Sequence, residues 1–116
     1  MLFRSVILRP DGEGTTLELV HEAPVDPDMW ARFGPGAVGV GWDLGLLGLL
    51  LHLTDGGQVD AAAALAFPTT REGRQFVRAA EHGWLTAAIA DGDEPAAAYE
   101  AASRTVAFYT GAAADE

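Results

Sequence analysis

The stretch GPGAVGVGWDLGLLGLLLHL, residues 34–53, is the longest apolar run in the chain and decides its fold. Counted from Gly36 at 3.6 residues per turn, it predicts a helix of about five turns, roughly 27 Å long. Four large side chains share one flank of this helix: Trp42, Leu46, Leu49 and Leu53. Three sides of the helix are apolar, and only the edge that carries Asp43 suits water. We therefore expect neighbouring elements to bury the helix on several sides.

The glycines inside this helix form a second pattern. Gly41, Gly45 and Gly48 fall on one line with His52. Each interior glycine costs about 1 kcal/mol of helix stability relative to alanine. A line of them is explained if another backbone or a bulky group approaches closely. We expect this line to be a close-packing surface.

Length and charge limit the class of protein. The 116 residues include no cysteine, and seven basic against 17 acidic residues give a formal charge of −10. We expect one domain, 1–116, without disulfides or thiolate chemistry. The negative charge repels phosphate backbones and anionic membranes, so neither nucleic acid nor a membrane is an expected partner.

The long apolar run also approaches the length of a transmembrane helix. A charged residue such as Asp43 near the middle would cost about 2.5–3.5 kcal/mol on insertion, and no cluster of Lys or Arg flanks the run. The first residues, MLFRSVILRP, do not have the uninterrupted apolar core of a signal peptide. We expect a cytoplasmic protein.

The N-terminal segment, 1–23, predicts a β-hairpin. Residues 2–9 are rich in β-formers, the turn 10–14 reads PDGEG, and 15–23 alternate cleanly. Leu17, Leu19 and His21 share one face of the second strand, and we expect that face to be buried. Two strands cannot cover a five-turn helix, so further strands or a second copy of the chain should complete the sheet.

The segments 24–55 and 56–116 predict helices. In the first, Asp26 should cap a short turn before the long helix, which Gly56 should end. In the second, a brief helix over 59–66 precedes two longer helices, one started by a Thr69–Glu72 capping box and running to about Asp91. The other should begin at an Asp93 cap and end before Gly111.

Periodicity predicts the inner faces of these two later helices. The first should bury a stripe of six residues: Phe76, Val77, Ala80, Trp84, Ala87 and Ala88. Its charged residues should face solvent: Arg74, Arg78, Glu81 and Asp91. The second should bury four residues: Tyr99, Ala102, Val106 and Tyr109.

No arrangement of residues specifies an enzyme, a metal or a cofactor. His21, His52 and His82 lie on different elements without metal-ligand spacing. The glycines of 34–39 have no strand before them and no Lys-Ser or Lys-Thr after them, so the phosphate-loop and dinucleotide fingerprints fail. We expect no catalytic residue, although His21 is the one titratable group on the inner hairpin face.

Three stretches together resemble a known family: GPGAVGVGWDLGLLGLLLHL at 34–53, EGRQFVRAAEHGWLTAAIADG at 72–92 and RTVAFYTG at 104–111. They are similar to the carboxyl-terminal half of bacterial SRPBCC proteins, the START or helix-grip superfamily often labelled polyketide cyclase-like or heat-shock-ATPase-activator-homologue-like. The resemblance implies an α+β fold in which an antiparallel hairpin precedes a long apolar helix and two further helices. Because the family's early strands have no counterpart here, it also implies a truncated, partial helix-grip domain.

The resemblance further implies a non-catalytic domain that binds a small apolar ligand under the long helix. The implied ligand-binding residues are Leu17, Leu19, His21, Trp42, Leu46, Leu49 and Leu53. As ordinary core residues, such side chains would also each contribute about 1.5–3 kcal/mol to the stability of the fold, whether or not a ligand is present. Apolarity alone therefore does not separate packing from binding. Two alternatives remain: a cyclase or aromatase in which His21 or Asp43 moves a proton, and a co-chaperone-like interaction module. The incomplete sheet also predicts a homodimer.

Overall fold

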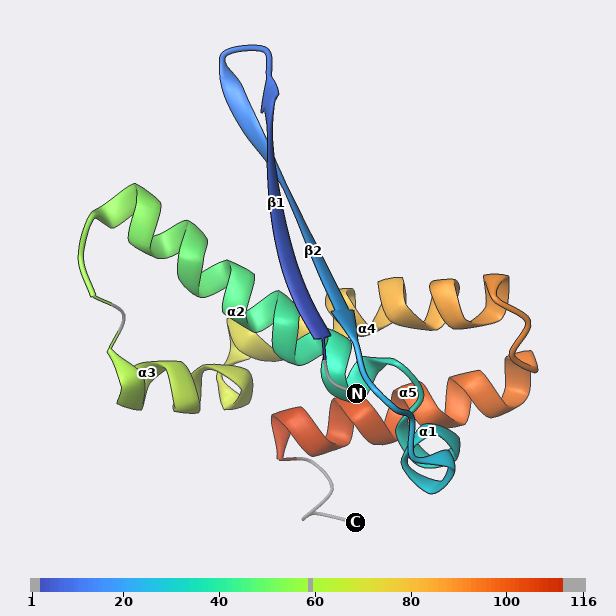
Figure 1. Ribbon diagram of the computed structural model, residues 1–116. Helices are drawn as coiled ribbons and strands as arrows, with labels where there is room; N and C mark the ends of the chain where they lie inside the picture. The colour runs from blue at the N-terminus through green and yellow to red at the C-terminus, as the bar shows by residue number, and fades with distance from the viewer. Residues whose placement is uncertain (1–2, 59, 112–116) are drawn as a thin grey trace.

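The computed structural model describes residues 3–58 and 60–111, and within them the chain has an α+β fold, as expected (Figure 1). Two antiparallel strands come first and helices follow. The elements are β1 (Phe3–Asp11), β2 (Gly14–Glu22), α1 (Pro27–Phe33), α2 (Gly36–Asp55), α3 (Ala61–Ala66), the 3₁₀ turn η1 (Phe67–Thr69), α4 (Arg71–Ala90) and α5 (Pro95–Thr110).

The hairpin of β1 and β2 projects away from the helices, with its turn far from them (Figure 1). Gly12 in that turn has φ +59°, a conformation that favours glycine. The register sets Val6 opposite Leu19 and Leu8 opposite Leu17, which gives one apolar face. Of the residues expected to be buried on this face, Leu19 and His21 are half-buried. The prediction is wrong for the part nearer the turn, where Leu17 is 38% exposed and its neighbours Val6 and Leu8 are 58% and 64% exposed.

The buried core lies among α2, α4 and α5. Val40 and Val77 are fully buried, and Leu85 packs with Ala98 and Ala102 of α5. The small side chains allow α4 and α5 to pack closely side by side. Tyr99, which was expected in the core, is instead 61% exposed, because alanines form the inner face of α5.

The long helix α2 is much less buried than its sequence predicts. Only Gly36, Gly39 and Val40, all in its first turns, are buried. The second half extends beyond the other helices towards α3 (Figure 1), and Leu53 is 71% exposed. By length and composition alone, α2 could also cross a membrane.

The predicted glycine line is not a close-packing surface for most of its length. A Cβ at Gly45 or Gly48 would meet no atom within 4 Å, and one at Gly41 would meet only the Tyr109 hydroxyl. The glycines against which neighbours pack are Gly36 and Gly39, on the side that faces α4. Periodicity placed the glycines on a common line correctly, but it could not show which line faces a neighbour.

Helix boundaries follow local capping signals closely. Asp26 caps α1 by accepting a hydrogen bond from the Asp28 amide (3.0 Å), and Gly56 ends α2 in the left-handed conformation, as predicted. The Thr69–Glu72 box is wrong by one residue, because Thr69 belongs to the 3₁₀ turn and Thr70 accepts from the amide of Gly73.

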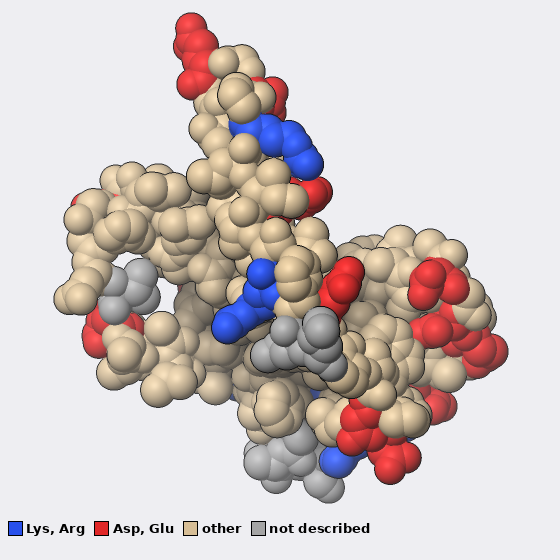
Figure 2. All heavy atoms as spheres, in the orientation of Figure 1, with Lys and Arg blue, Asp and Glu red and all other residues tan. Residues whose placement is uncertain are grey.

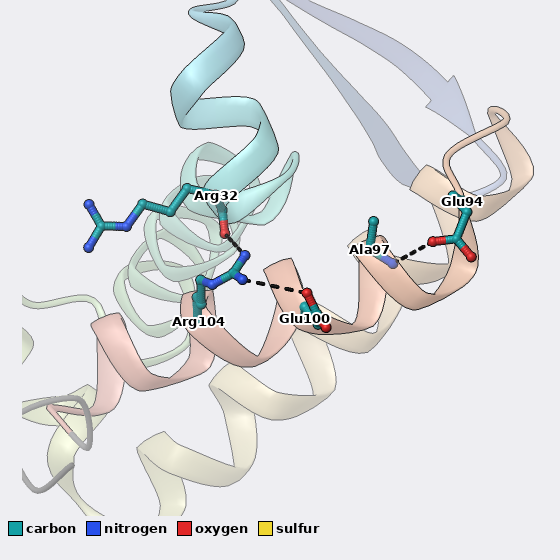
Figure 3. Close-up of polar contacts among 5 residues, drawn as sticks. All are labelled: Arg32, Glu94, Ala97, Glu100 and Arg104. Atoms are coloured by element: carbon teal, nitrogen blue, oxygen red, sulfur yellow. Dashed lines mark hydrogen bonds and ion pairs between the residues drawn. The ribbon is translucent and has the colours of Figure 1, made fainter.

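The cap of α5 is also one residue later than predicted. Glu94, not Asp93, accepts hydrogen bonds from the amides of Ala96, at 3.1 Å, and of Ala97, at 2.9 Å. Figure 3 shows the contact with Ala97. Pro95 begins the helix directly after this cap, at a position where its missing N–H needs no partner. The backbone of Asp93 instead donates to the carbonyl of Ala88, which closes the turn from α4.

Candidate functional site

Two of the predicted site residues contact each other. The indole Nε1–H of Trp42 on α2 donates a hydrogen bond to Nδ1 of His21 on β2, at 3.0 Å. The two rings meet edge to face, with centroids 5.4 Å apart and an interplanar angle of 68°. This contact attaches the base of the hairpin to the first half of α2.

The other predicted site residues do not close over a cavity with this pair. Leu17 is 38% exposed, Leu49 40% and Leu53 71%, while Leu19 is half-buried. Leu46 is 40% exposed and lines a different surface, the groove between α2 and α4. Leu46 therefore lines the α2–α4 groove, whereas Trp42, one turn away on the same flank of α2, contacts the hairpin.

The groove between α2 and α4 has a volume of about 690 Å³. It is open to solvent along its length. Its walls are almost wholly apolar: Leu46, Leu47, Leu50, Phe76, Ala79, Ala80, Gly83, Trp84 and Ala87, together with Asp43. Phe76, Ala80, Trp84 and Ala87 were expected in the core, but here they line a concave surface.

A polar pair joins the walls of this groove. The indole Nε1–H of Trp84 donates a hydrogen bond to Oδ2 of Asp43, at 2.8 Å. Asp43 was expected at a water-facing edge, but it is half-buried in the contact with α4. The glycine at position 39 permits this contact, because a Cβ there would overlap the Trp84 ring. The glycine thus places an aromatic residue and a carboxylate together in an apolar surface.

The two residues considered for proton transfer have separate hydrogen-bond partners. His21 Nδ1 accepts from Trp42, and Asp43 accepts from Trp84. Either side chain alone would have to reach the substrate atoms to act as a general acid or base.

A second cavity, of about 200 Å³, lies between α1, α4 and α5. Trp30 and Phe33 of α1 contribute to it, as do Ala98 and Ala101 of α5. Two hydrogen bonds hold α1 against α5: Thr105 Oγ1 donates to the Phe33 carbonyl at 2.9 Å, and Arg104 donates to the Arg32 carbonyl at 3.2 Å (Figure 3).

Glu81 of α4 also lines this second cavity, and the prediction that it faces solvent is wrong. It is only 3% exposed, and its Oε2 atom has no hydrogen-bond partner in the described part of the chain. Burial raises the pKa of its carboxyl group from 4.5 to about 7. The spacing contained a signal that was missed: Glu81 lies four residues from both Val77 and Leu85, which are buried.

No group of three or more His, Cys, Asp or Glu side chains that could hold a metal ion occurs within 3–58 and 60–111. No protein-family model, curated protein or solved structure matches the chain.

Proposed function

We propose that the chain is a non-catalytic binding domain for small apolar molecules and that the groove between α2 and α4 is its binding site. The observation that carries this proposal is the apolar groove itself. It has a volume of about 690 Å³, and its wall contains one polar pair, Asp43 and Trp84. Ligand sites typically have volumes of about 300–1,000 Å³, mostly apolar walls and a few placed polar groups.

The Asp43–Trp84 pair favours one kind of ligand. A carboxylate in an apolar wall repels anions, and it accepts a hydrogen bond from a ligand that has a donor. The ring of Trp84 offers a flat surface for an aromatic or alicyclic group. A neutral apolar molecule with a hydroxyl or amine substituent suits this groove better than a fatty acid does.

The resemblance to SRPBCC proteins supports the same class of function, because it implies an apolar ligand held by the long helix. The resemblance favours a different position for the ligand, on the side of α2 that faces the hairpin. There the His21–Trp42 hydrogen bond holds β2 in place. On that reading the chain is part of a helix-grip domain and needs further strands over the exposed hairpin face. The experiment below distinguishes the two positions.

The test is a fluorescence titration with N-phenyl-1-naphthylamine, a neutral apolar probe, of the wild type and two phenylalanine variants. Gly83→Phe puts a ring into the α2–α4 groove, because Gly83 lines it and a Cβ there meets no atom within 4 Å. Gly45→Phe is the matched control. It also replaces a helix glycine with open space around it, but it does not line the groove.

We expect saturable binding to the wild type, at least about tenfold weaker binding to Gly83→Phe, and unchanged binding to Gly45→Phe. Gly83→Phe that binds the probe like the wild type would exclude the α2–α4 groove. Loss of binding in Gly45→Phe alone would move the site to another face of α2.

A further inference from the structure

The second cavity has the features of a site for a positively charged ligand, independently of the groove proposed above. It lies between α1, α4 and α5, and its volume of about 200 Å³ admits only a small molecule. Glu81 of α4 forms part of its wall and is only 3% exposed to solvent. One of its carboxyl oxygens, Oε2, has no partner among the described residues.

A buried carboxyl group without a partner is costly, because it loses the hydrogen bonds that water gives it. The packing of α2 on α4 leaves room for the Glu81 carboxyl group. Glu81 lies against Gly36 at the start of α2, where any side chain would overlap the carboxyl group. A positively charged ligand in the cavity would compensate the ionised form of this carboxyl group.

The surroundings of the cavity attract cations. Asp93 and Glu94 also line it, and no Lys or Arg does. Glu94 is fixed by the hydrogen bonds that it accepts from the amides of Ala96 and Ala97, of which Figure 3 shows the second. Acidic atoms gather over the turn between α4 and α5, at the right of Figure 2, and the whole chain has a formal charge of −10. Such a field concentrates cations and repels anions.

The remaining walls suit a short hydrocarbon chain. Trp30 and Phe33 are aromatic, and the α5 side consists of alanines. The guanidinium carbon of Arg32 lies 5.0 Å from the centre of the Phe33 ring, so one face of that ring already accepts a cation. The Arg32 side chain itself extends away from Glu94 and α5 (Figure 3).

We propose that the cavity between α1, α4 and α5 binds the ammonium group of a small alkylamine, with the Glu81 carboxylate as its acceptor and the alkyl chain between Trp30 and the alanines of α5. Asp93 and Glu94 attract the ammonium group from the mouth of the cavity. Burial and the Glu81 charge both raise the pKa of the Tyr109 phenol, which therefore stays neutral.

The test uses n-butylammonium chloride as the probe at pH 8, where Glu81 is ionised, and follows the indole signal of Trp30 by NMR. We expect a saturable shift in the wild type and at least about tenfold weaker binding in Glu81→Gln, which keeps the shape but removes the charge. Glu72→Gln, at an exposed position of the same helix, is the matched control and should bind like the wild type. n-Butanol, which has the chain without the charge, should not give a saturable shift.

Equal binding of n-butylammonium by Glu81→Gln and the wild type would overturn the proposal, as would the absence of a Trp30 shift in the wild type. Gly83→Phe separates this site from the α2–α4 groove, because it should leave butylammonium binding unchanged.

Discussion

The carboxyl group of Glu81 on α4 occupies the space that a side chain at Gly36 on α2 would fill. This relationship joins the two longest helices at the start of α2, and it buries a titratable group between them. Because Oε2 has no partner among the described residues, the contact stabilises the fold only while the carboxyl group is neutral.

The stability of the protein should therefore fall as the pH rises through the Glu81 titration. Burial raises the pKa of Glu81 from 4.5 to about 7, so between these values the folded state binds more protons than the unfolded state. The free energy of unfolding then falls with pH, by about 3 kcal/mol in total from this group. Urea denaturation at a series of pH values measures this fall in the free energy of unfolding.

Glu81→Gln isolates this contribution, because the other carboxyl groups titrate equally in both proteins. The variant should be more stable than the wild type at pH 8, by about 3 kcal/mol, and close to it at pH 4. A difference between the two proteins that does not change with pH would contradict the burial of an ionisable Glu81.

Two glycines of α2 should respond in opposite ways to alanine. A Cβ at Gly39 would overlap the Trp84 ring, so Gly39→Ala should lower the free energy of unfolding by about 1–3 kcal/mol. A Cβ at Gly45 meets no atom within 4 Å, so Gly45→Ala should raise it by about 0.5–1 kcal/mol through helix propensity. Thermal and urea denaturation compare the two variants, and stabilisation of both would show that Trp84 does not pack on Gly39.

The hydrogen bond from Trp84 to Asp43 should contribute to the packing of α2 on α4. Asp43→Ala leaves the indole N–H without its acceptor and should cost about 1–2 kcal/mol of stability, whereas Asp43→Asn keeps an acceptor oxygen and should cost less. In a Trp84→Phe background the two substitutions should have equal effects. Unequal effects there would assign the role of Asp43 to another contact.

The exposed leucines of α2 predict self-association of the chain. Leu49 is 40% and Leu53 71% exposed on a helix whose second half contacts little else. Apolar surface of this kind commonly lies in an interface. We expect light scattering to show dimers or larger species in the wild type and more monomer in a Leu49→Glu, Leu53→Glu variant. A wild-type monomer at all concentrations would contradict the predicted homodimer.

The positions of the strands and helices could be predicted because their signals are local. The PDGEG turn, the Asp26 cap and the glycine after α2 all act within a few residues. Burial could not be predicted in the same way. Apolar residues on three sides of α2 suggested three neighbours, but its second half has few contacts with the other helices.

The candidate sites depend on contacts between distant residues, which periodicity cannot show. Trp42 and His21, both assigned to the predicted ligand site, are in contact, and their role in binding stays a prediction. Glu81 was assigned to solvent because charged residues usually lie there, and only its contact with Gly36 reveals the exception. The α2–α4 groove follows from Gly39, which brings Trp84 to Asp43.

The most direct test of the binding function uses the three tryptophans, because each lies at a different candidate site. Trp84 lines the α2–α4 groove, Trp42 contacts the hairpin, and Trp30 lines the acidic cavity. Their indole N–H signals can be followed by NMR, assigned with Trp→Phe variants, during titration with N-phenyl-1-naphthylamine. We predict a saturable shift of the Trp84 signal while those of Trp42 and Trp30 stay in place; a Trp84 signal that does not move while the probe binds would contradict binding in the α2–α4 groove.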